Sequence, residues 1–117
     1  MYRRQHLVAM AAALGLAGPL PQALAQDAFP SKTVRIVIPT ASGGTLDLLA
    51  RIVAEKLQAA WGQQVIVESR AGANTMLATS AVAKSPPDGH TALFTISGFV
   101  QNLVLQANPP YKASDLA

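Results

Sequence analysis

Short apolar runs alternate with helix-like stripes along the chain. Residues 33–38 are β-branched and apolar and end at Pro39, a pattern typical of a strand buried on both faces in a parallel sheet. Residues 46–61 change to a helical period, and Gly62 suits the left-handed position that ends a helix. We expect this helix to face the sheet with an apolar stripe of Leu49, Ile52, Val53, Leu57 and Ala60.

The same alternation continues downstream. Residues 64–68 and residues 91–95 predict two more strands, and residues 76–84 predict a helix between them. A Pro-Pro-Asp-Gly turn at residues 86–89 precedes the last strand, and residues 100–106 have the pattern of a further short helix. Strand, helix, strand, helix, strand predicts an α/β fold. Its βαβαβ unit would form a parallel sheet covered by helices through right-handed crossovers.

The first residues of the sequence contain the three parts of an export signal. Arg3 and Arg4 supply positive charge, and residues 7–20 carry none. Ala-Leu-Ala at residues 23–25 offers the small side chains that a signal peptidase recognises. The apolar stretch is interrupted by glycine and proline and is too short for a membrane span, which needs about 20 apolar residues. The pattern predicts a cleavable signal, and both the general secretory and the twin-arginine routes stay open.

We expect cleavage after Ala25, so that residues 1–25 are a signal peptide and residues 26–117 are a periplasmic protein. Arg3 and Arg4 are two of the nine lysines and arginines, which leaves seven bases against six acids after cleavage, a net charge of +1. This composition lacks the clustered basic patch of a nucleic-acid-binding protein, so we expect no nucleic-acid partner. The absence of cysteine excludes disulfides and cysteine-based catalysis or metal binding.

The connections that leave the carboxyl ends of the predicted strands carry the candidate chemistry. Residues 40–45, 69–75 and 96–99 each contain glycine among small hydroxyl or amide side chains. Ligands of open parallel sheets bind beyond these strand ends. A helix start there offers unpaired N–H groups and partial positive charge, which suits a carboxylate or phosphate. The same pattern is also typical of tight turns and simple helix caps, so that alternative stays open.

Two charged side chains near these connections have more than one interpretation. Asp47, in the first turn of the first helix, could orient the loop or bind a ligand's hydroxyl or amine. It could equally be a carboxylate favoured by the helix dipole alone. Arg70 could reach an anion from the second connection, or it could pair with Glu68 or with solvent.

No catalytic or metal site is predicted. His90 is the only histidine after cleavage, which with no cysteine gives no metal-ligand cluster. Ser42 and Ser97 lack the G-x-S-x-G elbow, and His90 lies at the opposite end of its strand, so nucleophile and base could not meet. G-x-G-x-x-G is absent, and we expect no cofactor. A secreted enzyme on an α/β scaffold and a periplasmic sensor or scaffold domain stay as alternatives.

Four stretches carry a family resemblance. They are FPSKTVRIVIPTASGGTLDLLARIVAEKL at residues 29–57, GQQVIVESRAGA at 62–73, AVAKSPPDGHTALF at 81–94 and PPYKASDLA at 109–117. In this order and spacing they resemble the Bug-type solute-binding receptors of tripartite tricarboxylate transporters. The resemblance implies a two-lobed periplasmic binding protein fold, with this unit as part of the first lobe. It also implies a receptor, not an enzyme, that captures a small carboxylate and delivers it to membrane transporter subunits.

The resemblance further implies where the ligand carboxylate binds. In the family it is held by main-chain and side-chain donors of the first loop and of the loop after the third strand. In this sequence the matching positions in the first loop and the helix after it are Ala41, Ser42, Gly43, Gly44, Thr45 and Asp47, and in the later loop Ser97 and Gly98.

The sequence departs from the family pattern at several of these loops. Thr45 and Leu46 replace a third glycine and a threonine, and His90 replaces a tyrosine. Asn-Thr-Met at residues 74–76 replaces Gly-Gly-Asn, and Ile-Ser-Gly at residues 96–98 replaces Thr-Asn-Gly. The pocket is therefore altered, and the resemblance does not identify the carboxylate.

Family members are also roughly two to three times longer. We therefore expect residues 26–117 to be an incomplete N-terminal lobe, either a fragment or the product of a truncated gene. Because the later strands and the second lobe would be missing, we predict that isolated residues 26–117 fold poorly and bind carboxylates weakly. Calorimetry measures both properties. A cooperative unfolding transition together with micromolar carboxylate binding would contradict this prediction.

Overall fold

The computed structural model of the chain describes residues 28–116, so the expected signal peptide at residues 1–25 lies outside the described residues. Strands and helices alternate as predicted. Their order is β1 (Val34–Ile38), α1 (Thr45–Trp61), β2 (Val65–Ser69), the 3₁₀ turn η1 (Ala73–Thr75), α2 (Met76–Ala83), β3 (Thr91–Leu93), α3 (Gly98–Leu105) and the 3₁₀ turn η2 (Ala113–Leu116). No helix in this part of the chain is long and apolar enough to cross a membrane.

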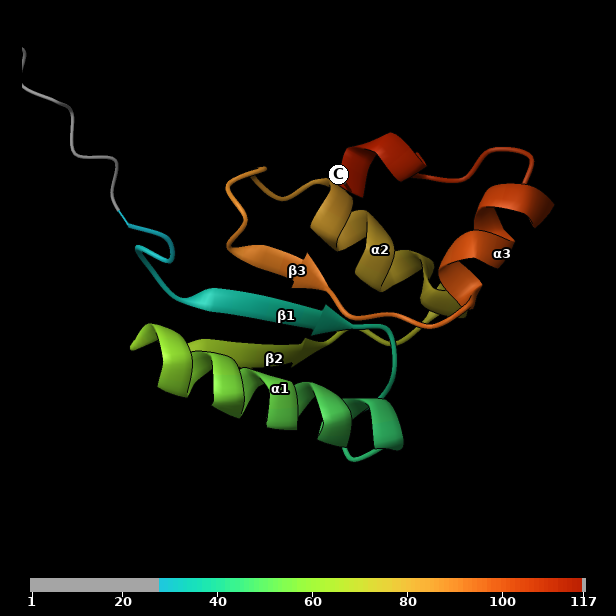
Figure 1. The fold of residues 1–117 in the computed structure, drawn as a ribbon. Coiled ribbons are helices and arrows are strands. Elements are labelled where there is room, and N and C mark those ends of the chain that lie inside the picture. The colour runs from blue at the N-terminus through green and yellow to red at the C-terminus, as the bar shows by residue number, and fades with distance from the viewer. Residues whose placement is uncertain (1–27, 117) are drawn as a thin grey trace, which may run out of the picture.

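The three strands form a parallel sheet in the order β2-β1-β3, with β1 in the centre. Val34 pairs with Val65 at one end of the β1–β2 ladder, and Val37 pairs with Leu93 at the end of the β1–β3 ladder. In Figure 1, α1 covers one face of the sheet and α2 lies over the other. The structure therefore confirms the predicted α/β class and its parallel sheet.

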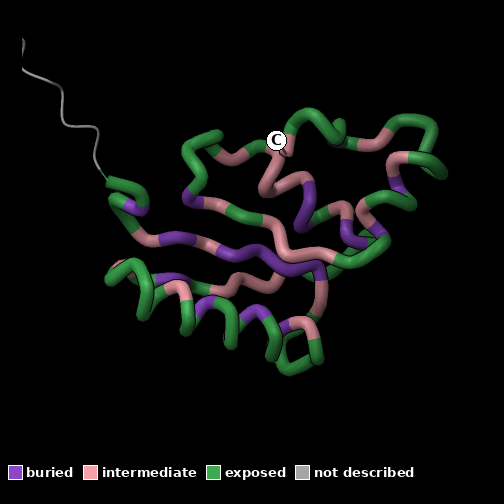
Figure 2. Tube along the Cα trace, viewed as in Figure 1, coloured by how far each residue is buried: buried purple, intermediate pink, exposed green. Residues whose placement is uncertain are grey.

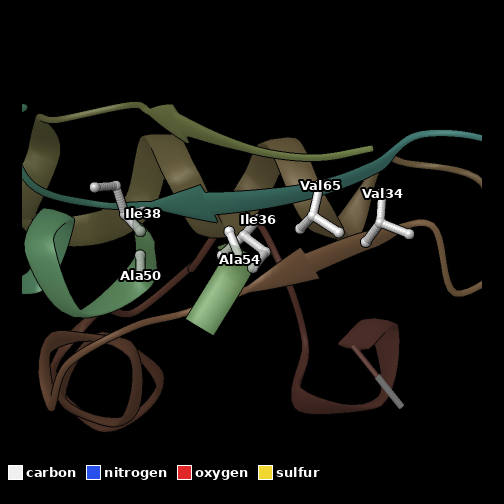
Figure 3. Close-up of a cluster of buried hydrophobic side chains, with 6 residues drawn as sticks. All are labelled: Val34, Ile36, Ile38, Ala50, Ala54 and Val65. Atoms are coloured by element: carbon white, nitrogen blue, oxygen red, sulfur yellow. The ribbon is translucent and has the colours of Figure 1, made fainter. Parts of the chain in front are cut away.

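The core forms between the central strand and α1. Ile38 and Val37 of β1 are fully buried although they point to opposite faces, as the β-branched run predicted. On the α1 face, Ala50 lies beside Ile38 and Ala54 lies beside Ile36 (Figure 3). The complete cluster is Val34, Ile36, Ile38, Ala50, Ala54 and Val65, flanked by the partly buried Leu46, Leu57, Val67 and Phe94.

The predicted apolar stripe of α1 is wrong. Leu49, Ile52 and Val53 are 47%, 48% and 43% exposed, and Ala60 is also exposed. Only Leu57 of the five lies against the core. The helix instead turns its small residues inward, because alanine allows a helix axis to approach the branched side chains of β1 closely. Figure 2 shows the exposed outer side of α1.

The later elements differ from the prediction mainly at their ends. β3 stops at Leu93, although the Phe94 N–H still donates to the Val37 carbonyl at 2.9 Å. Helix α3 begins at Gly98, two residues earlier than predicted. Gly62 takes the left-handed conformation expected of it, with φ 68°, and its N–H donates to the Gln58 carbonyl at 2.9 Å.

We predict that Gly62→Ala lowers the free energy of unfolding by about 1 kcal/mol. A Cβ there meets nothing within 4 Å, so the cost comes from the left-handed backbone alone. Gly44→Ala is the matched control. Gly44 has φ −82° and an added Cβ would lie 3.6 Å from the Ala41 carbonyl oxygen, an ordinary contact. Chemical denaturation of both variants, in the longest form that the gene encodes, measures the difference, and equal effects would contradict the assignment.

Candidate functional site

The parallel strands bring three loops to one edge of the sheet. The first loop joins β1 to α1 and turns at Gly43, whose φ is 89°. Gly44 follows in an extended conformation as the N-cap of α1 and has no side chain to cap the helix. The first helical hydrogen bond runs from the Leu48 N–H to the Gly44 carbonyl at 3.0 Å. The amides that precede Leu48 in the helix therefore have no carbonyl of their own helix to bond.

Asp47 fixes the shape of this loop. The residue as a whole is only 4% exposed, and its Oδ2 accepts hydrogen bonds from the Gly43 N–H at 2.8 Å and from Arg51 Nε at 3.0 Å. The Arg51 guanidinium and the Gly43 amide hold the pKa of the Asp47 carboxyl below its ordinary value. Its Oδ1 is buried and has no hydrogen-bond partner in residues 28–116. These contacts fit a loop-orienting role for Asp47, and a contact between Asp47 and a ligand stays a prediction.

An open cavity of about 280 Å³ lies at the start of α1. Four of the predicted site residues line it, namely Gly43, Gly44, Thr45 and Asp47. Leu48 and Arg51 complete the lining, and the sequence reasoning missed both. Arg51 lies outside the apolar stripe predicted for this helix, but its i,i+4 spacing from Asp47 indicates the ion pair that the structure contains.

Ala41 and Ser42 are exposed residues of the same loop and do not line this cavity. Ser97 is exposed at the N-cap of α3, whereas Gly98 is buried. A Cβ on Gly98 would lie 2.7 Å from the Thr75 Cγ2 atom, so the third loop packs closely on the second. Neither Ser97 nor Gly98 lines the cavity at the start of α1, and their approach to a ligand stays a prediction.

The second connection has an unusual backbone. Ala73, Asn74 and Thr75 all have positive φ, at 49°, 48° and 74°. Such conformations in residues other than glycine cost about 1–3 kcal/mol each and persist only where the surroundings enforce them. Asn102 of α3, which the sequence reasoning did not single out, hydrogen-bonds this turn. The sequence feature that could have identified Asn102 is that it is the only amide in the otherwise apolar second half of that helix.

Arg70 has a partner in the structure. Its Nε atom donates to Glu68 Oε1 at 2.6 Å, and Arg35 Nε donates to Glu68 Oε2 at 3.0 Å. The Arg35 guanidinium first, and then Arg70, hold the pKa of the Glu68 carboxyl below its ordinary value. The ion-pair interpretation of Arg70 therefore describes this structure.

His90 lies at the opposite edge of the sheet from the three loops. Its Nε2 accepts a hydrogen bond from the Ser31 N–H at 3.1 Å, and the Phe29 ring packs 4.9 Å from its ring. Lys32 pairs with Asp88 at 2.7 Å, which lowers the pKa of Asp88 to about 2. His90 therefore anchors the segment before β1. Residues 28–116 contain no group of three side chains able to hold a metal ion.

Comparison with known proteins identifies relatives for most of the chain. A family model described as "Tripartite tricarboxylate transporter family receptor" matches residues 49–117. A protein in the tcbD-tcbE intergenic region of Pseudomonas sp. (strain P51) is 38% identical over 111 residues, which cover 95% of this chain and 32% of the relative. Protein BugT of Bordetella pertussis is 37% identical over 103 residues, 86% of this chain and 30% of BugT.

Solved structures show the same arrangement of elements. Periplasmic binding protein BugD is 37% identical, with a TM-score of 0.67 over 72% of this chain and 28% of BugD. MatC from Rhodopseudomonas palustris, solved with bound malate, is 40% identical with a TM-score of 0.53 over 56% of this chain and 22% of MatC. R. palustris Rpa4515, solved with adipate, is 42% identical with a TM-score of 0.54 over the same shares. The chain spans less than a third of the length of these relatives.

The Asp47 contacts generate a pH prediction. Because the folded-state pKa of Asp47 lies below its ordinary value of 3.8, its stabilising contribution is complete well above pH 4. The contribution is lost as pH falls through the folded-state pKa. We predict that Asp47→Asn lowers the melting temperature by a few degrees at pH 7, and that this difference shrinks on acidification below pH 4. Glu55→Gln, at an exposed position of the same helix, is the control.

Melting curves of the parent and both variants, in the longest form that the gene encodes, measure this effect between about pH 7 and pH 2.5. A melting-temperature difference for Asp47→Asn that stays constant over this range would show that the Asp47 charge does not stabilise the loop.

Proposed function

Because the chain belongs to the tripartite tricarboxylate transporter receptor family, we propose that it recognises a small carboxylate in the periplasm for delivery to a membrane transporter. The observation that carries this proposal is the open start of α1. Glycine at positions 43 and 44 leaves the backbone accessible there, and the unpaired amides and the helix dipole favour an anion.

The hydrogen bonds around the cavity leave donors for the same ligand. Asp47 contributes a negative charge, but its Oδ2 is already used by the Gly43 N–H and by Arg51. The Gly43 amide is therefore turned toward the protein, which leaves the first-turn amides of α1 and the hydroxyl of Thr45 as the donors for an anion. Ser42, which is exposed on the same loop, could add a hydroxyl once a ligand is present.

The small size of the cavity supports a binding site that two lobes share. Ligand pockets usually measure about 300–1,000 Å³, and the cavity at the start of α1 has about 280 Å³ and is open to solvent. We propose that residues 26–117 form part of the first lobe of a two-lobed receptor, and that a second lobe closes over the ligand. The coverage of less than a third of each relative supports this arrangement. Residues 1–25 would be the signal peptide for export to the periplasm.

The relatives guide the choice of ligand. MatC was solved with malate and Rpa4515 with adipate, two dicarboxylates of different length. We therefore propose a dicarboxylate of this size range as the ligand of this chain, with one carboxylate at the start of α1. Ser97 and Gly98, on the neighbouring loop, would lie on the side from which the rest of the ligand approaches.

Binding is favoured over catalysis by the distribution of the side chains. Ser42 and Ser97 belong to the loops at the carboxyl edge of the sheet, whereas His90 lies at the other edge, bonded to Ser31. Within residues 28–116, the carboxyl edge of the sheet therefore carries hydrogen-bond donors and glycines but no serine–histidine pair.

We predict that Gly44→Val strongly weakens dicarboxylate binding, since its side chain would occupy the place of the anion. The backbone of Gly44 is extended, a conformation that valine adopts readily, so the fold should survive. Ser42→Ala should cost about 1–3 kcal/mol of binding free energy if its hydrogen bond is buried and charge-assisted. Lys84→Ala, at the exposed end of α2, is the control and should leave binding unchanged.

Titration calorimetry with malate and with adipate, on the longest form that the gene encodes, measures these effects. If Gly44→Val binds the better dicarboxylate as tightly as the parent does, the carboxylate does not bind at the start of α1.

A further inference from the structure

Asn102 is the most deeply buried amide side chain among the described residues, with 1% of its surface exposed. It lies on α3 and points toward the turn η1, which precedes α2. Its Nδ2 donates to the Asn74 carbonyl at 2.6 Å and to Thr75 Oγ1 at 3.3 Å. Its Oδ1 accepts from Asn74 Nδ2 at 3.2 Å. A buried amide with its donors and acceptor all engaged holds its partners in one arrangement.

The turn that Asn102 contacts does not keep its shape by intrinsic preference. Thr75 is β-branched and has φ 74°, where such a residue is a genuine outlier. Asn74 tolerates the left-handed region better, whereas this conformation is sterically unfavourable for Ala73 as well as for Thr75. The Thr75 carbonyl accepts from Thr79 Oγ1 at 3.0 Å, which ties the turn to α2 on one side. On the other side, Asn102 holds the turn to α3.

The same turn determines where the third loop lies. Gly98, at the first position of α3, is so close to Thr75 that a Cβ would lie 2.7 Å from Thr75 Cγ2 and 3.3 Å from Asn74 Oδ1. A shift of Thr75 toward a relaxed backbone would therefore move the start of α3. Asn102 lies one helical turn after Gly98 on α3, so the same helix contacts the turn at two points.

We propose that Asn102 is a positioning residue. It holds the left-handed turn at residues 73–75 against α3 and thereby fixes the second and third loops relative to each other at the ligand-binding edge. The effect on the turn follows from the contacts of Asn102, Asn74 and Thr75 alone. The consequence for ligand binding rests on the proposed function.

Amide hydrogen exchange on the longest form that the gene encodes tests the first part. The Met76 N–H, which donates to the Ala73 carbonyl, reports on the turn. The Phe99 N–H, which donates to the Ile96 carbonyl, reports on the third loop. The Arg35 N–H of the central strand β1, which donates to the His90 carbonyl, is the reference for overall stability. We expect Asn102→Ala to speed exchange at Met76 and Phe99 by about tenfold relative to Arg35.

Two further variants separate positioning from a general loss of stability. Thr75→Gly relieves the β-branched residue among the three left-handed ones, so in that background the turn depends less on Asn102. Adding Asn102→Ala should then speed exchange at Met76 by less than about threefold. Gln101→Ala, at the exposed neighbouring position of the same helix, should change neither reporter.

Malate and adipate titrations on the same variants test the second part. We expect Asn102→Ala to weaken binding of whichever dicarboxylate the parent binds, by about tenfold, and Thr75→Gly to reduce that loss. If the parent binds neither dicarboxylate, the proposed ligand is wrong, while the exchange results still decide the role of Asn102.

Equal acceleration at Met76, Phe99 and Arg35 in Asn102→Ala would overturn the proposal, because it would mean that the variant only destabilises the whole fold. An undiminished effect of Asn102→Ala in the Thr75→Gly background would overturn it as well, because Asn102 would then not act through the strained turn.

Discussion

The burial of β1 on both faces is the constraint on which the rest of the structure depends. Its neighbours β2 and β3 run parallel to it, so each must return across the sheet through a helix. The helices therefore cover opposite faces, and all three connections leave from the same edge (Figure 1). The close contact between Ile38 and Ala50 then fixes α1 at a short distance from β1, with its N-terminus beside the carboxyl end of the central strand (Figure 3).

This placement gives the edge of the sheet its chemistry. The first loop has to turn sharply from β1 into α1, and Gly43 makes the turn in a left-handed conformation. Asp47 accepts the hydrogen bond of the Gly43 N–H and is itself held by Arg51. The result is an accessible helix start, shaped from within by a buried carboxylate. In the described part of the chain this helix start is open to solvent, and such a helix start is suited to the carboxylate of a small solute.

The sequence predicted the order of the elements well, because β-branched runs and glycine turns act locally. Residues 33–38 and Gly62 are examples whose structure follows from their own conformational preferences. The inward face of α1 could not be predicted in the same way. Ala50 and Ala54 face the core because their small side chains let α1 approach β1 closely. Leu49 and Ile52 are more apolar and yet are exposed. The turn at residues 73–75 was also out of reach, because its left-handed residues are held by Asn102, 27 and 28 positions away.

A crystal structure of the longest form that the gene encodes, with malate or adipate bound, tests the central claim most directly. The account predicts one ligand carboxylate within hydrogen-bonding distance of the first amides of α1, beside Gly44 and Thr45, with the loop at Ser97 and Gly98 facing the ligand. A dicarboxylate bound elsewhere, with the start of α1 left to solvent, would contradict it.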